Sequence, residues 1–373
     1  VRPDQIKEEV GNVLKLIKIG VIIMLIPNYP NGSDITIMNV IYHYGMKISE
    51  TKRSEDILYI IYKDNKTGMK HLFPIMSPKY TFYKLPDELQ TNYNHFFYNK
   101  NDLIPITCKY NELNKVIAEQ IGMKHEFYEN IKNGNPKANK FLHADSRIFS
   151  SDIEITDYYR MKFGRDYTNR ITKITKLYID IEVDIKYMVG DFPEPGECPI
   201  NALSILNEEN HTLYTFLLRD SRNKKIEEFE NYLKDNTEQF DIDFMNLLAD
   251  TVGGWKNVNR FNLEYLQVKQ IFYDDELELI TEAFKAINIL KPDFVLAWNM
   301  AFDIPYIIER IKKLGYDPTE IMTHPDFKYK NAEYFVDELM RDLFAERGDF
   351  AYISSYSVFI DQLIQFASRR KSQ

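Results

Sequence analysis

Cysteine, tryptophan and long apolar runs are all scarce in this sequence of 373 residues. The only two cysteines, Cys108 and Cys198, exclude a disulfide framework and a clustered thiolate metal site. We therefore expect a protein of a reducing compartment, namely the cytoplasm, or the host cytoplasm if the protein is viral. The sequence has neither internal repeats nor a low-complexity tract, which argues against a solenoid and against a disordered chain.

The most apolar run is too short to cross a membrane. It covers residues 14–26, contains Lys15 and Lys18, and ends at Pro27. A spanning helix needs about 20 apolar residues, so we interpret this run as a buried element and expect no membrane partner.

The formal net charge of −9 argues against a protein that coats nucleic acid through a general positive field. It leaves open a protein that binds a single strand in a local groove, particularly where carboxylates hold divalent cations. The 26 tyrosines and 24 phenylalanines fit a large core, and a few of them could stack on bases.

The first part of the sequence has mostly β-strand patterns. Residues 35–85 are rich in β-formers, and the turn Asp64–Gly68 predicts a hairpin between two such runs. A helix is expected over residues 111–122 and a loop over 133–140. We place a domain boundary after this loop, which gives a β-rich domain with helices (1–165) and a second domain (166–373).

The second part alternates strands and helices. Two strands with short joints after the first one favour an antiparallel meander. Pro305 marks the start of the last helix and Gly315 its end. The expected elements are a strand at 177–184, a turn-rich connector at 190–199, strands at 200–207 and 212–218, a helix at 274–290, a strand at 293–299 and a helix at 304–315.

The strand at 177–184 has an unusual division of side chains. Because successive side chains of a strand point to opposite faces, one face is apolar and the other acidic. Leu177, Ile179, Ile181, Val183 and Ile185 share the apolar face, and Tyr178, Asp180, Glu182 and Asp184 share the other. Taken alone, the acids fit a half-exposed strand with a solvated face, so a functional interpretation needs a partner from elsewhere in the chain.

Asp303 is the candidate partner. It stands at the joint between the strand at 293–299 and the following helix. If this strand lies beside the first one, Asp303 meets Asp180 and Glu182. Three such carboxylates without a nearby lysine or arginine repel one another and persist chiefly when cations neutralise them. Two divalent ions about 4 Å apart can activate a water and stabilise the leaving oxygen in phosphodiester cleavage.

These residues carry a resemblance to a known family. "YIDIEVD" resembles the first exonuclease motif, Asp-x-Glu, of the proofreading domain in family B DNA polymerases, and "WNMAFDIPYIIERI" resembles the second. The likeness extends to "DFPEPGECPINALSI" and "YDDELELI", which are similar to polymerases of tailed bacteriophages. More weakly, it covers most of residues 35–370.

The resemblance implies an α+β protein: a ribonuclease H-like exonuclease domain with a mixed sheet, preceded by a β-rich polymerase N-terminal domain. It implies removal of 3′-terminal nucleotides from single-stranded DNA with two divalent ions, Mg²⁺ or Mn²⁺. Asp180 would bridge both ions, Glu182 would hold the ion with the attacking water, and Asp303 the other. Asn299 and Phe302 would lie beside the terminal nucleotide, whereas Asp184 is interpreted as solvated strand-end charge.

Several of these residues have simpler interpretations. An asparagine before a turn often serves its own backbone, which applies to Asn299, and Phe302 fits ordinary packing. Trp298 is expected in the core. The basic residues 369–371 could contact phosphate, although a frayed charged end explains them as well.

The third motif of the family, Tyr-x-x-x-Asp on a later helix, has no good match. The segment Tyr356–Asp361 has one residue too many and resembles the strand and helix start that precede this motif. The polymerase motifs Asp-x-x-Ser-Leu-Tyr-Pro and Asp-Thr-Asp are also absent. We therefore expect a fragment of a longer polymerase that ends before the third motif, with weak or no nuclease activity of its own.

The expected partners are single-stranded and primer-template DNA, the remaining polymerase domains and, through missing regions, a sliding clamp. A non-catalytic DNA-binding or scaffolding subunit of a split polymerase remains the alternative. A free nuclease of the wider family that acts on RNA is a third possibility, against which the polymerase-like upstream residues count.

Overall fold

The computed structural model describes seven stretches of the chain: residues 35–47, 54–89, 100–124, 142–166, 173–219, 224–336 and 349–371. The buried element expected at 14–26 and the loop expected at 133–140 lie outside these residues. Within them, none of the helices combines the length and the apolarity needed to span a bilayer.

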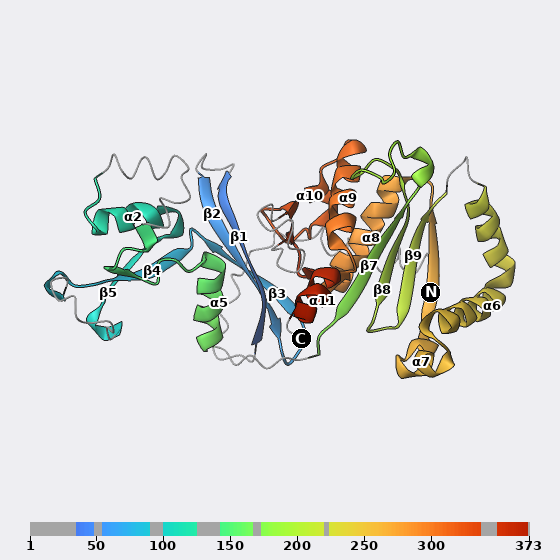
Figure 1. The fold of residues 1–373 in the computed structure, drawn as a ribbon, viewed down its shortest axis with the longest axis horizontal. Helices are drawn as coiled ribbons and strands as arrows, with labels where there is room; N and C mark the ends of the chain where they lie inside the picture. Colours follow the sequence, from blue (N-terminus) through green and yellow to red (C-terminus); the bar gives the residue numbers. More distant parts are fainter. Residues whose placement is uncertain are drawn as a thin grey trace, which may run out of the picture.

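Two antiparallel sheets of three strands form the first part (Figure 1). One has the order β1-β2-β3 and the other the order β5-β4-β6. Helices α2 and α5 pack against them around a shared apolar cluster. The elements are β1 (Ile35–Lys47), β2 (Ser54–Asp64), β3 (Lys70–Met76), β4 (Lys79–Lys84), η1 (Asp87–Leu89), η2 (Lys100–Asp102), β5 (Ile104–Lys109), η3 (Tyr110–Glu112), α2 (Leu113–Gln120), β6 (Ile148–Phe149) and α5 (Ile155–Asp166).

The predicted hairpin and the predicted first helix are both confirmed. Strands β2 and β3 pair antiparallel across a turn in which the Asp64 carboxylate accepts from the backbone N–H groups of Lys66 and Thr67. Gly68 follows with a φ of +72°, a conformation that glycine adopts without strain. Helix α2 lies within the expected 111–122 and is followed by Gly122 at φ +71°.

A six-stranded mixed sheet organises the second part (Figure 1). Its order is β10-β9-β8-β7-β11-β14, and only β8 runs antiparallel to its neighbours. The expected meander of three strands is therefore confirmed. The strands are β7 (Lys176–Val183), β8 (Ile200–Asn207), β9 (Thr212–Leu218), β10 (Gln267–Tyr273), β11 (Phe294–Ala297) and β14 (Val358–Asp361), and β12 (Ala332–Phe335) pairs separately with β13 (Phe350–Ile353).

Helices connect the parallel strands and cover one face of this sheet. The crossover from β9 to β10 runs through α6 and α7, and α8 and α9 pack on the apolar face. The helical elements are η4 (Ile185–Tyr187), α6 (Lys225–Val252), α7 (Trp255–Arg260), η5 (Leu263–Tyr265), α8 (Glu276–Leu290), α9 (Met300–Lys313), α10 (Pro318–Met322) and α11 (Gln362–Lys371).

Helix α9 begins four residues earlier than predicted, at Met300 rather than at 304. The carbonyl of Asn299 accepts from the N–H groups of Phe302 and Asp303 and so starts the helix before the proline. Pro305 then lies inside the helix, where its missing N–H removes one backbone hydrogen bond. The consequence is that Asp303 lies in the first turn of α9.

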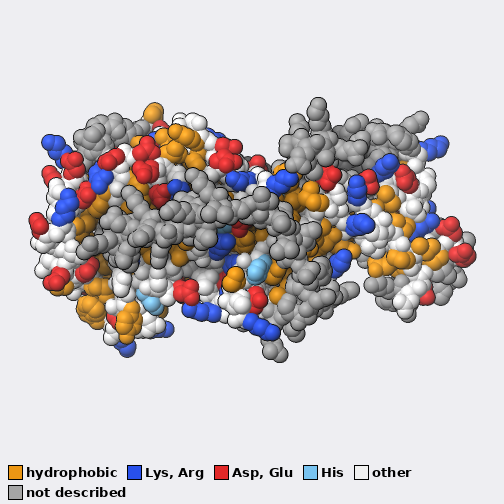
Figure 2. All heavy atoms as spheres, turned by 180° about the vertical axis from the view of Figure 1, so that it is seen from behind, with side chains coloured by type: hydrophobic (Ala, Val, Ile, Leu, Met, Phe, Trp, Pro, Cys, Tyr) orange, Lys and Arg blue, Asp and Glu red, His pale blue; other side chains and the backbone are white. Residues whose placement is uncertain are grey.

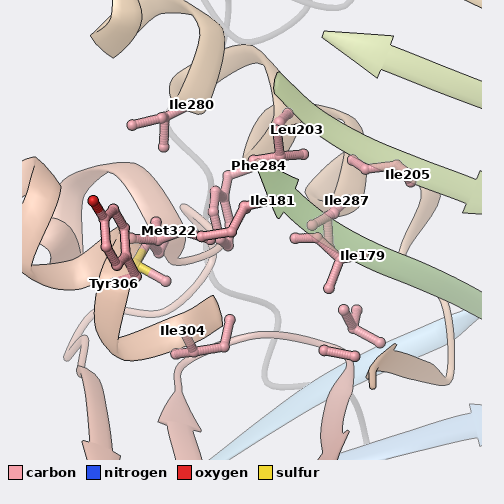
Figure 3. Close-up of a cluster of buried hydrophobic side chains, with 14 of the residues drawn as sticks. Ile179, Ile181, Leu203, Ile205, Ile280, Phe284, Ile287, Ile304, Tyr306 and Met322 are labelled. Atoms are coloured by element: carbon pink, nitrogen blue, oxygen red, sulfur yellow. The ribbon is translucent and has the colours of Figure 1, made fainter. Parts of the chain in front are cut away.

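The core of the second part lies between the sheet and these helices. Figure 3 shows side chains of β7 and β8 facing those of α8, α9 and α10. Completely or almost completely buried side chains fill this layer, and they include Ile179, Leu203, Ile280, Phe284 and Ile304. Burial of this kind stabilises by roughly 1.5–3 kcal/mol for each large apolar side chain.

The two parts meet through an apolar cluster and a buried ion-pair group. Tyr59 of β2 packs on Phe327, and its hydroxyl oxygen accepts from the N–H of Tyr329 at 3.1 Å. The carboxylate of Asp293, just before β11, pairs with the ammonium groups of Lys63 at 3.1 Å and Lys70 at 2.9 Å. The hairpin β2–β3 is therefore fastened to the start of the strand that leads to Asp303.

Candidate active site

Strand β7 shows the alternation that the sequence predicts. Leu177, Ile179 and Ile181 are buried against the helices, whereas Asp180 and Glu182 are exposed on the opposite face. The strand ends at Val183, so the expectation for Ile185 is wrong: this residue lies in η4 and is 61% exposed. The two acids thus stand on the sheet face that α8 and α9 leave uncovered.

Asp184 follows the strand in a local structural role. Its carboxylate accepts from the backbone N–H of Lys186 at 3.1 Å and so caps η4. The carboxylate thus caps the short helix after the strand, and the exclusion of Asp184 from the catalytic set stays a prediction.

Strand β11 lies parallel to β7, as the interpretation of Asp303 requires. The register pairs Leu296 with Tyr178, so the end of β11 and the N-terminus of α9 lie beside the carboxyl-terminal half of β7. Asp303 is buried there, with 4% of its side chain exposed.

The electrostatics of Asp303 show that the predicted acids influence one another. Burial, followed by the charges of Asp180, Asp361 and Glu182, raises the pKa of Asp303 to about 7. Within the described ranges, no lysine or arginine forms an ion pair with any of these four residues. Partial burial also raises the pKa of Asp180, although its side chain reaches solvent.

The acids are near one another without forming a closed cage. No three His, Cys, Asp or Glu side chains in the described part of the chain approach closely enough to hold a metal ion as they stand. Mutual repulsion of unneutralised carboxylates favours such separation. The structure thus brings Asp180, Glu182 and Asp303 within electrostatic reach and leaves their metal ligation a prediction.

Asp361 also belongs to the acids around Asp303, although the sequence pattern did not favour it as a metal ligand. The expected strand and helix start at 356–361 are confirmed as β14 and α11. One oxygen of Asp361 accepts from the N–H of Ile364 at 3.0 Å, and the other accepts from the N–H of Ala301 at 3.3 Å. An aspartate between an apolar strand and a helix is a typical N-cap signal, which is the pattern that identifies it.

The two predicted substrate residues lie at the N-terminus of α9. Asn299 precedes the helix, but its exposed side chain makes no capping hydrogen bond. A hydrogen bond from the side chain to the helix N-terminus therefore does not explain why asparagine stands here. Phe302 is half-buried, and its ring contacts those of Tyr306 at 5.2 Å and Phe192 at 5.5 Å between centroids. Phe192, 69% exposed on the connector after β7, is a neighbour that the sequence did not indicate.

Helix α9 holds the connector that carries Phe192. The Tyr306 hydroxyl accepts from the N–H of Cys198 at 2.7 Å and donates to its carbonyl at 3.0 Å. Gly196 has a φ of +69°, and a Cβ at this position would lie 2.6 Å from the backbone nitrogen of Arg310. The close approach requires glycine and fixes the connector against the helix.

The expectation that Trp298 belongs to the core is wrong. Its side chain is 56% exposed, and its ring contacts the similarly exposed ring of Phe366 with 6.1 Å between centroids. Because Ala297 points into the core, the next residue along the chain points to the acidic face of the sheet.

A family model for the exonuclease domain of DNA polymerase family B matches residues 130–372. The chain belongs to this family. No individually curated protein matches the chain. Membership in a family of polymerase exonuclease domains supports a nuclease role in proofreading and implies contact with DNA.

Proposed function

We propose that this chain is a 3′–5′ exonuclease module that removes terminal nucleotides from single-stranded DNA with two divalent ions. The observation that carries the proposal is the group of unneutralised acids around Asp303. Burial and three other carboxylates raise the pKa of this residue to about 7, and none of the contributing charges is positive. A group that lacks a protein cation is suited to divalent ions.

The donor set fits Mg²⁺ or Mn²⁺ because it consists of carboxylate oxygens. Asp180, Glu182 and Asp303 are the proposed ligands. When bound, such ions supply an activated water and stabilise the leaving oxygen. The protein contributes the position of each oxygen, through strand β7 for two acids and through the first turn of α9 for the third.

Asn299 and Phe302 are proposed to contact the 3′-terminal nucleotide. Asn299 presents an uncommitted amide beside Asp303, and the Phe302 ring stands against the exposed Phe192 ring. Aromatic rings and a polar amide suit an unpaired terminal nucleotide. Figure 2 shows acidic and basic side chains interspersed over the described part of one face, with no broad basic surface there, which fits binding at a local site.

We also propose the finer features of the family resemblance. The sheet order, with β8 as the single antiparallel strand, supports a ribonuclease H-like exonuclease domain. The shared apolar cluster of α5 with β1, β2 and β4 supports a boundary near residue 166 and a separate β-rich N-terminal domain. The phage-type assignment rests on the quoted motifs and the segments beside them.

The test combines metal binding with hydrolysis. We expect Mn²⁺, followed by electron paramagnetic resonance, to bind the wild-type chain and to bind Asp303→Asn at least about tenfold more weakly. We expect a 5′-labelled single-stranded oligonucleotide to be shortened slowly from its 3′ end, since no Tyr-x-x-x-Asp follows the second motif. Absence of both Mn²⁺ binding and shortening would refute the proposal.

A second candidate function is a DNA-binding or scaffolding subunit without hydrolysis. The finding that favours it is the lack, among the described residues, of three acidic or metal-ligating side chains close enough for a metal ion. Binding of the labelled oligonucleotide that is equal in EDTA and in Mn²⁺, with no detectable Mn²⁺ site, would support this function over the first.

A further inference from the structure

Trp298 lies on the acidic face of the sheet, directly beside the proposed catalytic residues. The parallel pairing of β11 with β7 ends at Leu296 and Tyr178, and Trp298 and Asp180 each follow this pair by two residues. Neighbouring strands are about 4.8 Å apart, and both side chains are exposed on the face opposite the core. The indole therefore lies on the same side of the sheet as the carboxylates.

A second exposed aromatic ring accompanies this indole. Phe366 of α11 is 47% exposed and contacts Trp298 with 6.1 Å between centroids and 49° between the ring planes. The junction that presents the two rings is fixed, because the N–H of Leu363 donates to the carbonyl of Trp298 at 3.0 Å and Asp361 caps the helix. Two large aromatic side chains thus stay about half exposed at a hydrogen-bonded junction.

The charge pattern of α11 favours nucleic acid as the occupant. The chain has a net charge of −9, yet positions 369–371 in the last turn of α11 are all basic. Bases stack on aromatic rings and phosphates pair with basic residues, which is the combination found in proteins that bind single strands.

We infer that Trp298 and Phe366 form a stacking subsite for an unpaired base of the DNA strand next to its 3′-terminal nucleotide. The inference rests on the proposed exonuclease function, because the acids and Asn299 define where the 3′ end lies. The subsite holds the strand by the flat face of a base and is indifferent to sequence. Its role is to keep the terminal phosphodiester over the acids while the strand shortens.

The two tryptophans of the chain give a direct test. Trp255 lies on α7, is 51% exposed and serves as the matched control. In Trp255→Phe, titration with oligothymidylate in EDTA should quench the fluorescence of Trp298; in Trp298→Phe, the remaining Trp255 should stay unquenched. Anisotropy of a labelled oligothymidylate gives the affinity independently of either tryptophan.

Removal of a stacking ring should weaken binding on the order of tenfold in Trp298→Ala and in Phe366→Ala. Trp298→Phe should retain most of the affinity, and Trp255→Ala all of it. Thermal unfolding followed by circular dichroism shows whether each variant is folded, and the conservative Trp298→Phe variant keeps the test decisive if an alanine variant unfolds.

Two results would overturn the inference and leave the proposed function standing. One is oligonucleotide binding without quenching of Trp298 and with unchanged affinity in Trp298→Ala. The other is equal quenching by a blunt duplex, which has no unpaired base to stack. Absence of any oligonucleotide binding by anisotropy would instead refute the proposed function together with the inference.

Discussion

Replacing Asp303 by asparagine should stabilise the metal-free protein at neutral and alkaline pH. The folded state buries this carboxyl beside three other acids, which raises its pKa from 3.8 to about 7. Between these two values the folded protein binds more protons than the unfolded one, so stability falls as pH rises through this window. Asparagine has a similar shape and carries no proton to lose, so it avoids this fall.

The size of the effect follows from the two pKa values. A difference from 3.8 to about 7 corresponds to roughly 4 kcal/mol once the pH exceeds 7. At pH 5 the carboxyl is ionised in the unfolded state but mostly protonated in the folded one. The cost to the free energy of folding is then set by the interval between pH 5 and the unfolded pKa of 3.8, and it amounts to roughly 2 kcal/mol. These are upper values, since rotation of the exposed acids toward water relieves part of the repulsion. We expect Asp303→Asn to gain about 2–4 kcal/mol at pH 8 and clearly less at pH 5.

Urea unfolding of wild type and Asp303→Asn in EDTA, at several pH values between 5 and 8, measures this difference. Asp191→Asn is the control, because Asp191 is an exposed carboxyl on the nearby connector and should change stability by less than about 0.5 kcal/mol. A stability difference for Asp303→Asn that is zero, negative or independent of pH would refute the electrostatic account of the site.

Two further predictions concern how the site is held in place. Asp293→Ala leaves two buried lysine ammoniums without their carboxylate, so we expect a loss of stability of roughly 3–5 kcal/mol in urea unfolding. The control Lys173→Ala removes an exposed lysine and should cost less than about 1 kcal/mol. Equal losses in the two variants would contradict the buried ion-pair group. Gly196→Ala forces a Cβ against the backbone of Arg310 at a positive φ, so we expect a loss of stability of about 1–3 kcal/mol in thermal unfolding. The control Gly190→Ala, whose Cβ would meet only one atom at 3.7 Å, should be nearly neutral. The reverse order would show that the connector does not pack on α9 as described.

The elements that the sequence predicted well are those with a local signal. The alternation in β7 depends only on the period of a strand, and the burial of Ile179 and Ile181 opposite Asp180 and Glu182 follows from it. The hairpin after β2 depends on turn chemistry within a few residues. The position of Asp303 at the joint after β11 follows from the order of elements, so three acids of the candidate site could be named before their contacts were known.

Long-range packing explains most of what the sequence did not predict. Trp298 was assigned to the core on hydrophobicity, but which face of β11 is covered depends on helices from elsewhere in the chain. Phe192 lies in a turn-rich connector whose position is set by its contacts with α9. The ion pair of Lys63 with Asp293 joins residues 230 positions apart, a contact without a local pattern.

The start of α9 was misplaced for a different reason. Proline is favoured in the first turn of a helix, so the sequence predicts that the helix starts at Pro305. The carbonyl of Asn299 starts the helix earlier, and the helix continues through Pro305 without the hydrogen bond that its missing N–H would make. A single-residue signal was thus outweighed by the hydrogen bonds of its neighbours.

The double hydrogen bonding of Asp361 couples two helices that are far apart in sequence. One carboxylate fixes the first turn of α9 through Ala301 and the first turn of α11 through Ile364, so neither helix can tilt without the other. A random mutagenesis screen for loss of the proposed nuclease function should therefore return substitutions in α11 at positions other than Phe366. In such mutants, a shift of α11 would move the first turn of α9 and so displace the carboxylate of Asp303.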